Sequence, residues 1–502
     1  MSKFIIFFVL ALCHIHAVFA QIDVADFPEK FQFFARDKVT NTAQVSFMVA
    51  ISREDKGSAA FSVFKNGLLV HTQTQNLNKS NHIFTFSYSM AAELSLYKFA
   101  LTTQTKNTGL ATYEADSLVA GDVYVLNGQS NAQTANSSSN AVISPFVRTF
   151  GRNKEHFGSA NIFVGNDLVW SLATQGITSS GYLNGLGELG GLFAQKIISQ
   201  NQMPVAIFNA TRAGSIINTF MKIPDDPYNI NTNYGRLMNR LNLAGVQNNV
   251  TGYIWYQGEA VTPNYLQTLK SFIDDLEADM PSIACFYVFQ VCRNECNQIP
   301  NTDITFATRA AQNEIVGYYA HQKVQTIATS DIPHYWDRCH FGAVEYQEHA
   351  LRLYQLVNRD IYGYTNYPTT INSPQITGAQ IDPNNSQFII LTTKNTTDSL
   401  AYRWRYSNAY NTSAVTVDSL FSTGFVLYGA ANDGIETATC IGNHIVLKRQ
   451  NPSANIPTHI GYKGNLRAST NSIVSDQTIN SPVVINQSNI GLLSFDMLPI
   501  TP

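Results

Sequence analysis

The feature of this sequence that most constrains its fold is a regular alternation of short apolar runs and helical patterns between about residues 119 and 360. Apolar runs of strand length occur at residues 122–126, 204–209, 252–256, 284–291 and 324–329. Longer segments with apolar residues at helical spacing separate these runs, and a last one follows the fifth run. The alternation predicts an α/β domain with a parallel five-stranded sheet that helices cover on both faces.

The segments on either side of this region have a different sequence pattern. Residues 30–118, and the residues after Tyr364, contain short alternating or β-branched runs separated by Asn, Asp, Gly and Pro clusters. We therefore expect all-β domains to flank the α/β domain. The expected division is a signal peptide, an N-terminal β domain, the α/β domain and a C-terminal β-sandwich-like domain, at residues 1–20, 21–118, 119–362 and 363–502.

The first twenty residues resemble a cleaved secretory signal. Lys3 precedes an apolar run that ends in Val18-Phe19-Ala20, which predicts Gln21 as the mature N-terminus. The run is too short and wrongly flanked for a membrane span. We therefore expect a protein that is secreted or held in an endomembrane or lysosomal lumen. N-glycans are expected on some of the eight sequons, at Asn78, Asn136, Asn209, Asn249, Asn384, Asn395, Asn411 and Asn486.

The charge balance excludes two classes of partner. The net charge is −3 and the isoelectric point is near 6.4. Such a chain has no excess of positive charge, so we expect it to bind neither nucleic acid nor an anionic membrane surface.

The cysteines allow two interpretations. Five of the six cysteines remain after signal removal, so one thiol is left without an intramolecular disulfide partner. Cys292 and Cys296 flank Arg-Asn-Glu, a spacing that fits half a metal site or, as we favour, a disulfide-bonded loop. Cys285 lies in an apolar run and is expected to be buried.

Polar and glycine-bearing clusters follow the predicted strands. In an open α/β sheet, ligands bind beyond the carboxyl ends of the strands. The segments at those ends are Asn127-Gly128-Gln129-Ser130-Asn131, Asn209–Ser215, Gln257-Gly258-Glu259, and a stretch with Asp331, His334, Asp337 and His340. Their clustering at one edge of the predicted sheet indicates a functional site.

The residue types in these clusters fit acyl transfer. A Ser hydroxyl becomes a useful nucleophile when a His takes its proton, and an acid must orient that His. Asp337 precedes His340 by three residues on one loop, and Ser130 follows the first strand. The negative oxygen that develops on the attacked carbonyl needs N–H donors. The N–H of Ser130, a backbone N–H near Gly214 and the side-chain amide of Gln257 are suitable donors.

These segments carry a resemblance to a known family. GDVYVLNGQSN (121–131) resembles the nucleophile block of the SGNH hydrolases in the form found in sialate O-acetylesterases and related carbohydrate acetylesterases. IWYQGEA (254–260) is similar to the third block of that family, and DRCHFGAVEYQEHALRL (337–353) is similar to its Asp-X-X-His block. PVAIFNATRAGSIINTF (204–220) resembles the second block, although Ala213-Gly214-Ser215 stands where the family usually has Gly-Gly-Thr/Ser.

The resemblance implies a fold and an activity. It implies a flavodoxin-like SGNH hydrolase domain over 119–362, with Ser130 as nucleophile, His340 as general base and Asp337 as its orienting acid. Ser130, Gly214 and Gln257 would line the oxyanion hole. The implied reaction is removal of O-acetyl groups from carbohydrates through an acetyl-enzyme, without metal or cofactor.

Several alternatives stay open at this point. Ser130 could be a helix N-cap, Asp331 and His334 could be the acid and base, and His334 and His340 could be zinc ligands. Candidate substrate-binding residues are Asn131, Arg212 and Glu259, and Glu259 could instead orient Gln257 or a loop. Arg212 could meet an acidic sugar such as sialate or simply be solvated. Asn209 opens a sequon beside the predicted site, so we expect it to be buried and unmodified.

Two other functions remain possible. The chain could be an esterase of the same fold that acts on a non-sugar ester, or a catalytically silent carbohydrate-binding glycoprotein. Sugar binding by the β domains would separate the first of these from a carbohydrate esterase. Intact Ser130, Gln257, Asp337 and His340 argue against the second.

Overall fold

A computed structural model describes most of the chain. The described residues are 22–51, 55–106, 109–134, 141–151, 168–176, 185–292, 304–320, 322–332, 339–396, 401–406, 409–410, 422, 424–453, 455–463, 482–485 and 492–502. The predicted signal peptide and the sequons at Asn136, Asn411 and Asn486 lie outside these residues, as do His334, Asp337 and Cys296. The chain divides into two compact units, one of residues 1–32, 44–90 and 95–118, the other of residues 33–43, 91–94 and 119–502.

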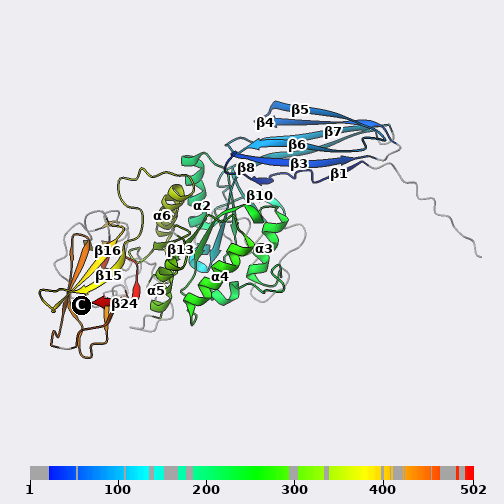
Figure 1. The fold of residues 1–502 in the computed structure, drawn as a ribbon. Coiled ribbons are helices and arrows are strands. Elements are labelled where there is room, and N and C mark those ends of the chain that lie inside the picture. Colours follow the sequence, from blue (N-terminus) through cyan, green and yellow to red (C-terminus); the bar gives the residue numbers. More distant parts are fainter. Residues whose placement is uncertain are drawn as a thin grey trace, which may run out of the picture. The chain divides into compact units, whose positions relative to one another are not determined.

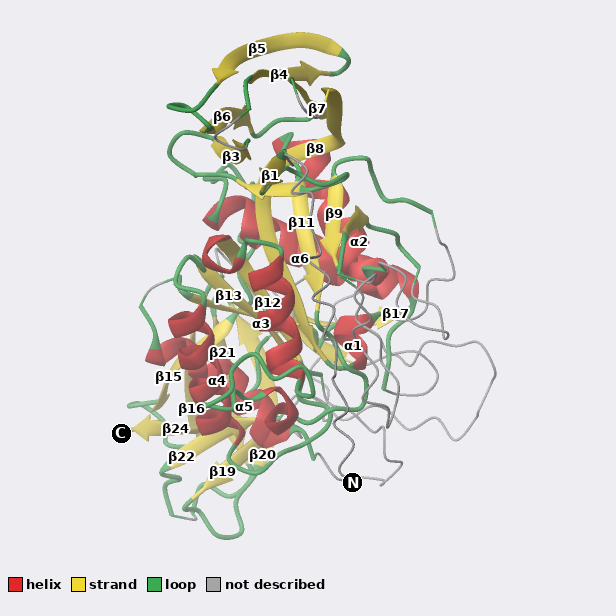
Figure 2. Cartoon of the chain, turned by 90° about the vertical axis from the view of Figure 1, so that its right-hand side faces the viewer, coloured by secondary structure: helices red, strands yellow, loops and turns green. Residues whose placement is uncertain are grey.

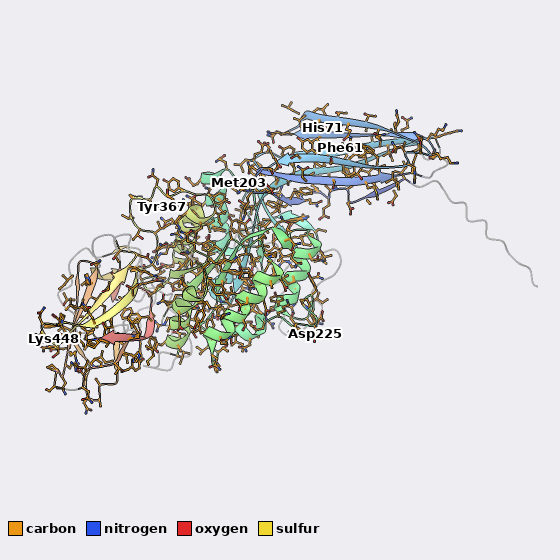
Figure 3. The ribbon with its side chains drawn as sticks, viewed as in Figure 1. Phe61, His71, Met203, Asp225, Tyr367 and Lys448 are labelled. Atoms are coloured by element: carbon orange, nitrogen blue, oxygen red, sulfur yellow. The ribbon has the colours of Figure 1, made fainter. Side chains whose placement is uncertain are left out.

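The first unit consists of β-strands. Its sheets have the orders β1-β3-β6 and β5-β4-β7-β8, the second antiparallel. The strands are β1 (Asp23–Ala25), β3 (Thr42–Ala50), β4 (Gly57–Lys65), β5 (Leu68–Leu77), β6 (Ile83–Ala91), β7 (Tyr97–Thr105) and the first half of β8 (Gly109–Gly128). Burial alternates along these strands, as expected for one buried face. Phe61, labelled with His71 in Figure 3, packs edge-to-face against Phe47 and Phe99.

The second unit is built around a parallel sheet. Its order is β10-β9-β11-β8-β12-β13-β14. The strands besides β8 are β9 (Val147–Phe150), β10 (Trp170–Leu172), β11 (Val205–Asn209), β12 (Val250–Tyr256), β13 (Cys285–Gln290) and β14 (Val324–Ala328). All neighbouring pairs are parallel except β9 and β10. Each of the five expected runs forms a strand here, but β9 and β10 extend the sheet beyond five.

Short strands explain why the sequence did not indicate β9 and β10. They have four and three residues, below the length at which an apolar run can be recognised. β2 (Phe33–Ala35) also pairs with β8 in parallel, at Val119–Gly121. The central strands β11, β12 and β13 are buried at every residue, which is why they read as continuous apolar runs.

Helices cover both faces of this sheet. They are α1 (Ser130–Gln133), α2 (Gly187–Lys196), α3 (Asn233–Leu243), α4 (Tyr265–Asp279), α5 (Phe306–Glu314) and α6 (Ala343–Asp360), with short helical turns at Ile197–Asn201, Ile217–Phe220, Gln247–Asn249 and Ile315–Tyr318. α2 packs against α6, and α4 packs against α5. Figure 2 shows α3, α4 and α5 on one side of the sheet and α2 and α6 on the other.

The C-terminal part of the second unit is again β-structure. A seven-stranded sheet has the order β19-β22-β24-β15-β16-β21-β20, and a three-stranded sheet has the order β18-β17-β23. The strands are β15 (Gln375–Ile381), β16 (Phe388–Lys394), β17 (Ala401–Tyr406), β18 (Ala409–Tyr410), β19 (Phe425–Tyr428), β20 (Ile435–Ile441), β21 (His444–Arg449), β22 (His459–Tyr462), β23 (Pro482–Ile485) and β24 (Phe495–Thr501). They are drawn in yellow to red in Figure 1.

Buried hydrogen bonds connect this C-terminal part to the parallel sheet. Gln290, at the end of β13, accepts from the N–H of Ser494 at 2.9 Å and donates to its carbonyl at 3.1 Å. Arg309 of α5 donates to the carbonyl of Lys463 at 2.6 Å. Since these groups lie away from water, breaking the contacts would leave polar atoms unsatisfied. The C-terminal strands are therefore integral to the second unit.

Candidate active site

The sheet order fixes where a ligand can bind. β8 lies between β11 and β12 in the order β11-β8-β12-β13-β14, so the connections leave β8 toward opposite sides of the sheet. Such a switch point opens a crevice at the carboxyl ends of the strands. Ser130 follows β8 and Gln257 follows β12, so both come directly after strands that flank this crevice.

Two glycines allow these chain ends to approach each other. A Cβ on Gly128, whose φ is +135°, would lie 2.0 Å from the carbonyl oxygen of Tyr256. A Cβ on Gly258, whose φ is +147°, would lie 2.7 Å from the methyl group of Thr308. Any side chain would clash at either position and would also strain the backbone. The Gly in each of the two motifs is thus required by packing.

Ser130 and His340 form the centre of the site. His340 Nε2 lies 2.9 Å from Ser130 Oγ, although the two residues are 210 positions apart in the chain. Ser130 begins the short helix α1 directly after β8, and His340 lies just before α6. The N-cap of α1 is Gln129, so Ser130 is not the helix cap; its hydroxyl contacts an imidazole that can accept its proton.

The sequence offers two candidate acids for His340, Asp337 and Asp331. Asp337, the predicted orienting acid, and His334 lie outside the described residues. Asp331 is described, and both of its carboxylate oxygens bind the guanidinium of Arg352, with Nη1 to Oδ1 at 2.8 Å. A carboxylate held in a buried bidentate ion pair has little capacity left to orient a histidine. The geometry therefore disfavours the alternative acid Asp331.

Gln257 does not have the geometry expected of an oxyanion donor. It is fully buried, with 0% of its surface exposed. Its Nε2 lies 3.1 Å from each of three protein acceptors, Gln129 Oε1 and the carbonyls of Ser215 and Ala260. An amide nitrogen has only two protons, so none remains for a substrate oxygen. We correct the expectation here: Gln257 connects three loops.

Gln129 is the partner that the sequence did not indicate. Its Oε1 accepts from Gln257 Nε2, from the N–H of Gly258 at 3.3 Å and from the N–H of Ala260 at 3.1 Å. The residue directly before Ser130 is thereby fixed to the loop that follows β12. The side-chain direction of Gln129 is decided by this packing, and no sequence signal could have revealed it.

The loop after β11 contributes an accessible glycine. Gly214 is exposed, has a φ of +66°, and has open space where a Cβ would lie. Among the described residues, no protein acceptor takes its N–H. This amide and the N–H of Ser130 at the start of α1 are the backbone donors that remain from the predicted oxyanion set.

Arg212 lies on the same loop. Its backbone N–H donates to the carbonyl of Gly128 at 2.8 Å, which ties the loop to the nucleophile strand. Its side chain is half-buried and reaches Asn233 Oδ1 only at 3.4 Å. Within the described part of the chain no carboxylate pairs with it. Its guanidinium is therefore available to an anionic ligand.

Asn131 and Glu259, two further candidates for substrate binding, are buried and bound to protein. Asn131 is 0% exposed and Glu259 is 6% exposed. Asn131 Nδ2 donates to Glu259 Oε1 at 2.6 Å and to the carbonyl of Cys339 at 3.1 Å, and Tyr346 donates to Asn131 Oδ1 at 2.8 Å. These bonds occupy the Asn131 amide, and the Glu259 carboxylate is buried, so the structure does not support substrate contact by either residue. Tyr346 and Cys339 are additional members of the site.

Burial changes the electrostatics of Glu259. Desolvation raises the pKa of its carboxyl to about 6, and the bond from Asn131 and the charge of His340 act in the opposite direction. Burial also raises the pKa of the neighbouring Tyr256 well above its ordinary value.

Asn209 is buried, as expected. It is 5% exposed, its Nδ2 donates to the carbonyl of Gly185 at 3.0 Å, and its Oδ1 accepts from the hydroxyl of Thr211 at 2.7 Å. The carbonyl of Asn209 binds the buried guanidinium of Arg240 at 2.8 Å. The amide nitrogen that a glycan would need is thus enclosed.

The disulfide pairing differs from the expectation. Cys285, Cys292 and Cys440 are not disulfide-bonded. Cys285 and Cys292 are buried, and Cys440 is partly exposed. Cys339, the neighbour of His340, is disulfide-bonded instead. The expected Cys292–Cys296 loop is therefore wrong, because spacing within one loop does not reveal which chain ends meet in space. Cys285 is buried as expected.

The described residues contain neither a metal-binding cluster nor a membrane-spanning helix. No group of three or more His, Cys, Asp and Glu side chains is arranged there to hold a metal ion. No helix in the described ranges has the length and apolar composition needed to cross a bilayer.

A Ser–His pair at the switch point of a parallel sheet is a site for hydrolytic acyl transfer. Residues 120–358 match the family model described as "Carbohydrate esterase, sialic acid-specific acetylesterase". Over this part, just under half of its length, the chain is therefore similar to that family of carbohydrate esterases, and the similarity supports carboxylic ester hydrolysis as its class of activity.

One solved structure supports the fold. A carbohydrate acetylesterase from Xanthomonas citri has 17% sequence identity and a TM-score of 0.60, covering 95% of this chain and 99% of that chain. A protein from Arabidopsis thaliana is similar at 15% identity and a TM-score of 0.36, covering 48% of this chain and 99% of that one. No curated protein sequence matches.

Proposed function

We propose that this protein removes O-acetyl groups from carbohydrates, with Ser130 as nucleophile and His340 as general base. The observation that carries the proposal is the 2.9 Å contact between His340 Nε2 and Ser130 Oγ. The match of residues 120–358 to a carbohydrate esterase family model supports an acetylated sugar as the substrate class. Because the sequence predicts a signal peptide, we expect the enzyme to act outside the cell or in an endomembrane or lysosomal lumen.

The proposed reaction has two halves. Ser130 Oγ attacks the acetyl carbonyl while its proton passes to His340 Nε2, and collapse of the tetrahedral adduct returns that proton to the departing sugar hydroxyl. Water then attacks the acetyl-Ser130 ester and loses a proton to His340. Collapse of this second adduct releases acetate, and His340 returns the proton to Ser130 Oγ. The N–H groups of Ser130 and Gly214 would stabilise the negative oxygen in both adducts. Asp337 would hold the His340 tautomer that keeps Nε2 unprotonated.

Arg212 indicates which acetylated sugars the enzyme prefers. Its half-buried guanidinium lies on the loop that carries Gly214 and has no carboxylate partner among the described residues. A guanidinium matches the fork of a sugar carboxylate. We expect acidic O-acetylated sugars such as acetylated sialic acid to be preferred over neutral ones such as acetylated xylan.

The test compares acetate release from acetylated sialic acid and acetylated xylan, by the wild type and by Ser130→Ala. Release by the wild type alone supports the serine esterase, and the better substrate identifies the sugar class. Arg212→Gln should reduce kcat/KM for the acidic sugar and leave that for xylan unchanged. If neither sugar nor an aryl acetate is hydrolysed by the wild type, the proposal is wrong and a binding role is the better explanation.

A further inference from the structure

Glu259 is a buried carboxylate that the proposed reaction does not use. It follows β12, and one of its oxygens accepts from Asn131 Nδ2 at 2.6 Å. The other oxygen, Oε2, is buried and has no hydrogen-bond partner among the described residues. Burying a carboxylate with one oxygen unsatisfied is costly, so a purely structural role does not explain it.

Asn131 connects Glu259 to both halves of the nucleophile–base pair. It is the neighbour of Ser130 in α1, and its Nδ2 also donates to the carbonyl of Cys339, the neighbour of His340. Its Oδ1 accepts from Tyr346 of α6. One amide therefore binds the segment that carries the base while it belongs to the segment that carries the nucleophile.

The acceptors decide which way this amide points. An ionised carboxylate and a backbone carbonyl only accept hydrogen bonds. If the Asn131 amide were turned over, Oδ1 would face both Glu259 Oε1 and the Cys339 carbonyl, and two attractive contacts would become repulsive. Ionised Glu259 thus favours the one orientation in which Nδ2 holds Cys339.

We propose that Glu259 is a positioning residue that acts through Asn131, holding the Cys339 carbonyl and so keeping His340 Nε2 on the Ser130 hydroxyl. This inference rests on the proposed function, because it assigns a role within the same acyl transfer. Glu259 touches no reacting atom in this arrangement.

The test compares Glu259→Ala and Glu259→Gln with the wild type. The Ala variant removes the acceptor, and we expect kcat to fall by about 100-fold with KM changed by less than about threefold, as for a base displaced by about an ångström. The Gln variant can still accept from Asn131 without a charge, and we expect a loss of roughly 10-fold.

Glu188→Gln is the matched control. Glu188 of α2 is also a buried carboxylate, and it accepts from two neutral amides, Gln175 at 2.8 Å and Gln347 at 3.3 Å. Its substitution removes the same charge at a site that does not contact Ser130, Asn131 or His340. Both kcat and KM should stay as in the wild type.

A phosphonate probe separates failure of this inference from failure of the proposed function. The rate at which an alkyl fluorophosphonate modifies Ser130 measures the nucleophile–base pair without any sugar. Slower labelling of both Glu259 variants, with wild-type labelling of Glu188→Gln, supports the inference even if no sugar is hydrolysed. Labelling of both Glu259 variants at the wild-type rate, or a kcat that stays at the wild-type value in Glu259→Ala, overturns it. An unreactive wild-type Ser130 overturns both.

Discussion

Gln129 Oε1 and Gln257 Nε2 lie 3.1 Å apart and join the residue before the nucleophile to the loop that follows the neighbouring strand. The same Gln129 oxygen accepts the N–H groups of Gly258 and Ala260. The glutamines of the two motifs thus bind each other. This pairing assigns Gln257 a supporting role and leaves oxyanion stabilisation to backbone amides.

The first prediction concerns Gln257. Gln257→Leu leaves Gln129 Oε1 and the carbonyls of Ser215 and Ala260 without their shared donor, so we expect the free energy of unfolding to fall by about 2 kcal/mol or more. Urea unfolding measures this, with the exposed Gln104→Leu as a control that should change it little. An unchanged free energy of unfolding together with a kcat reduced about 100- to 1,000-fold would instead identify Gln257 as an oxyanion donor.

The second prediction concerns the ion pair that fixes the segment after β14. Arg352→Met would leave the buried carboxylate of Asp331 without its bidentate partner, and we expect a loss of about 3–5 kcal/mol in the free energy of unfolding. Lys270→Met removes the partly exposed partner of Asp274 on α4 and should cost less than about 1 kcal/mol. Equal losses in the two variants would contradict a structural role for the Asp331–Arg352 pair.

The third prediction concerns stability against pH. Because the folded protein raises the pKa of Glu259 to about 6 from the ordinary 4.5, it binds this proton more tightly than the unfolded chain does. Ionised Glu259 therefore destabilises the fold above about pH 6, and stability is regained as the pH falls from 6 toward 4.5. At about 1.4 kcal/mol for each pKa unit, the effect is on the order of 2 kcal/mol.

Urea unfolding of the wild type and Glu259→Gln at pH 7 and pH 5 isolates this contribution. Glu259→Gln should be the more stable protein at pH 7, and its advantage should shrink at pH 5. A difference between the two proteins that does not depend on pH would show that Glu259 does not titrate in this range.

The fourth prediction concerns glycosylation. After expression in a glycosylating secretory host, Asn209→Gln should leave the glycan mass unchanged, since the Asn209 amide is buried and bound to Gly185. Asn384→Gln should remove one glycan, since Asn384 is exposed in the turn between β15 and β16. Mass spectrometry of the intact proteins measures the glycan mass of each variant. A glycan on Asn209 would contradict the described packing around β11.

The order of motifs along the chain predicted the meeting of Ser130 and His340 well. Both follow buried strands, and parallel strands bring their carboxyl ends to one edge, so the topology alone brings them close. The direction of the amide side chains could not be predicted in the same way. Gln129, Asn131 and Gln257 are alike as residue types, and only packing decides which of them faces protein and which could face substrate.

The same limit applies to pairing over long distances. Cys292 lies near Cys296 in the sequence, yet Cys339 carries a disulfide while Cys292 does not. The buried pair of Asp331 and Arg352 likewise joins a loop to a helix 21 positions further along. Such contacts follow from the path of the chain in space, which local patterns in the sequence do not contain.

The central claim is that Ser130 forms an acetyl ester during turnover. The most direct test is to quench the wild type with acid during hydrolysis of an aryl acetate and to analyse the digest by mass spectrometry. The account predicts the mass increment of one acetyl group on the peptide that contains Ser130, with none in Ser130→Ala. Rapid acetate release with no acetylated Ser130, or with the acetyl group on another residue, would contradict it.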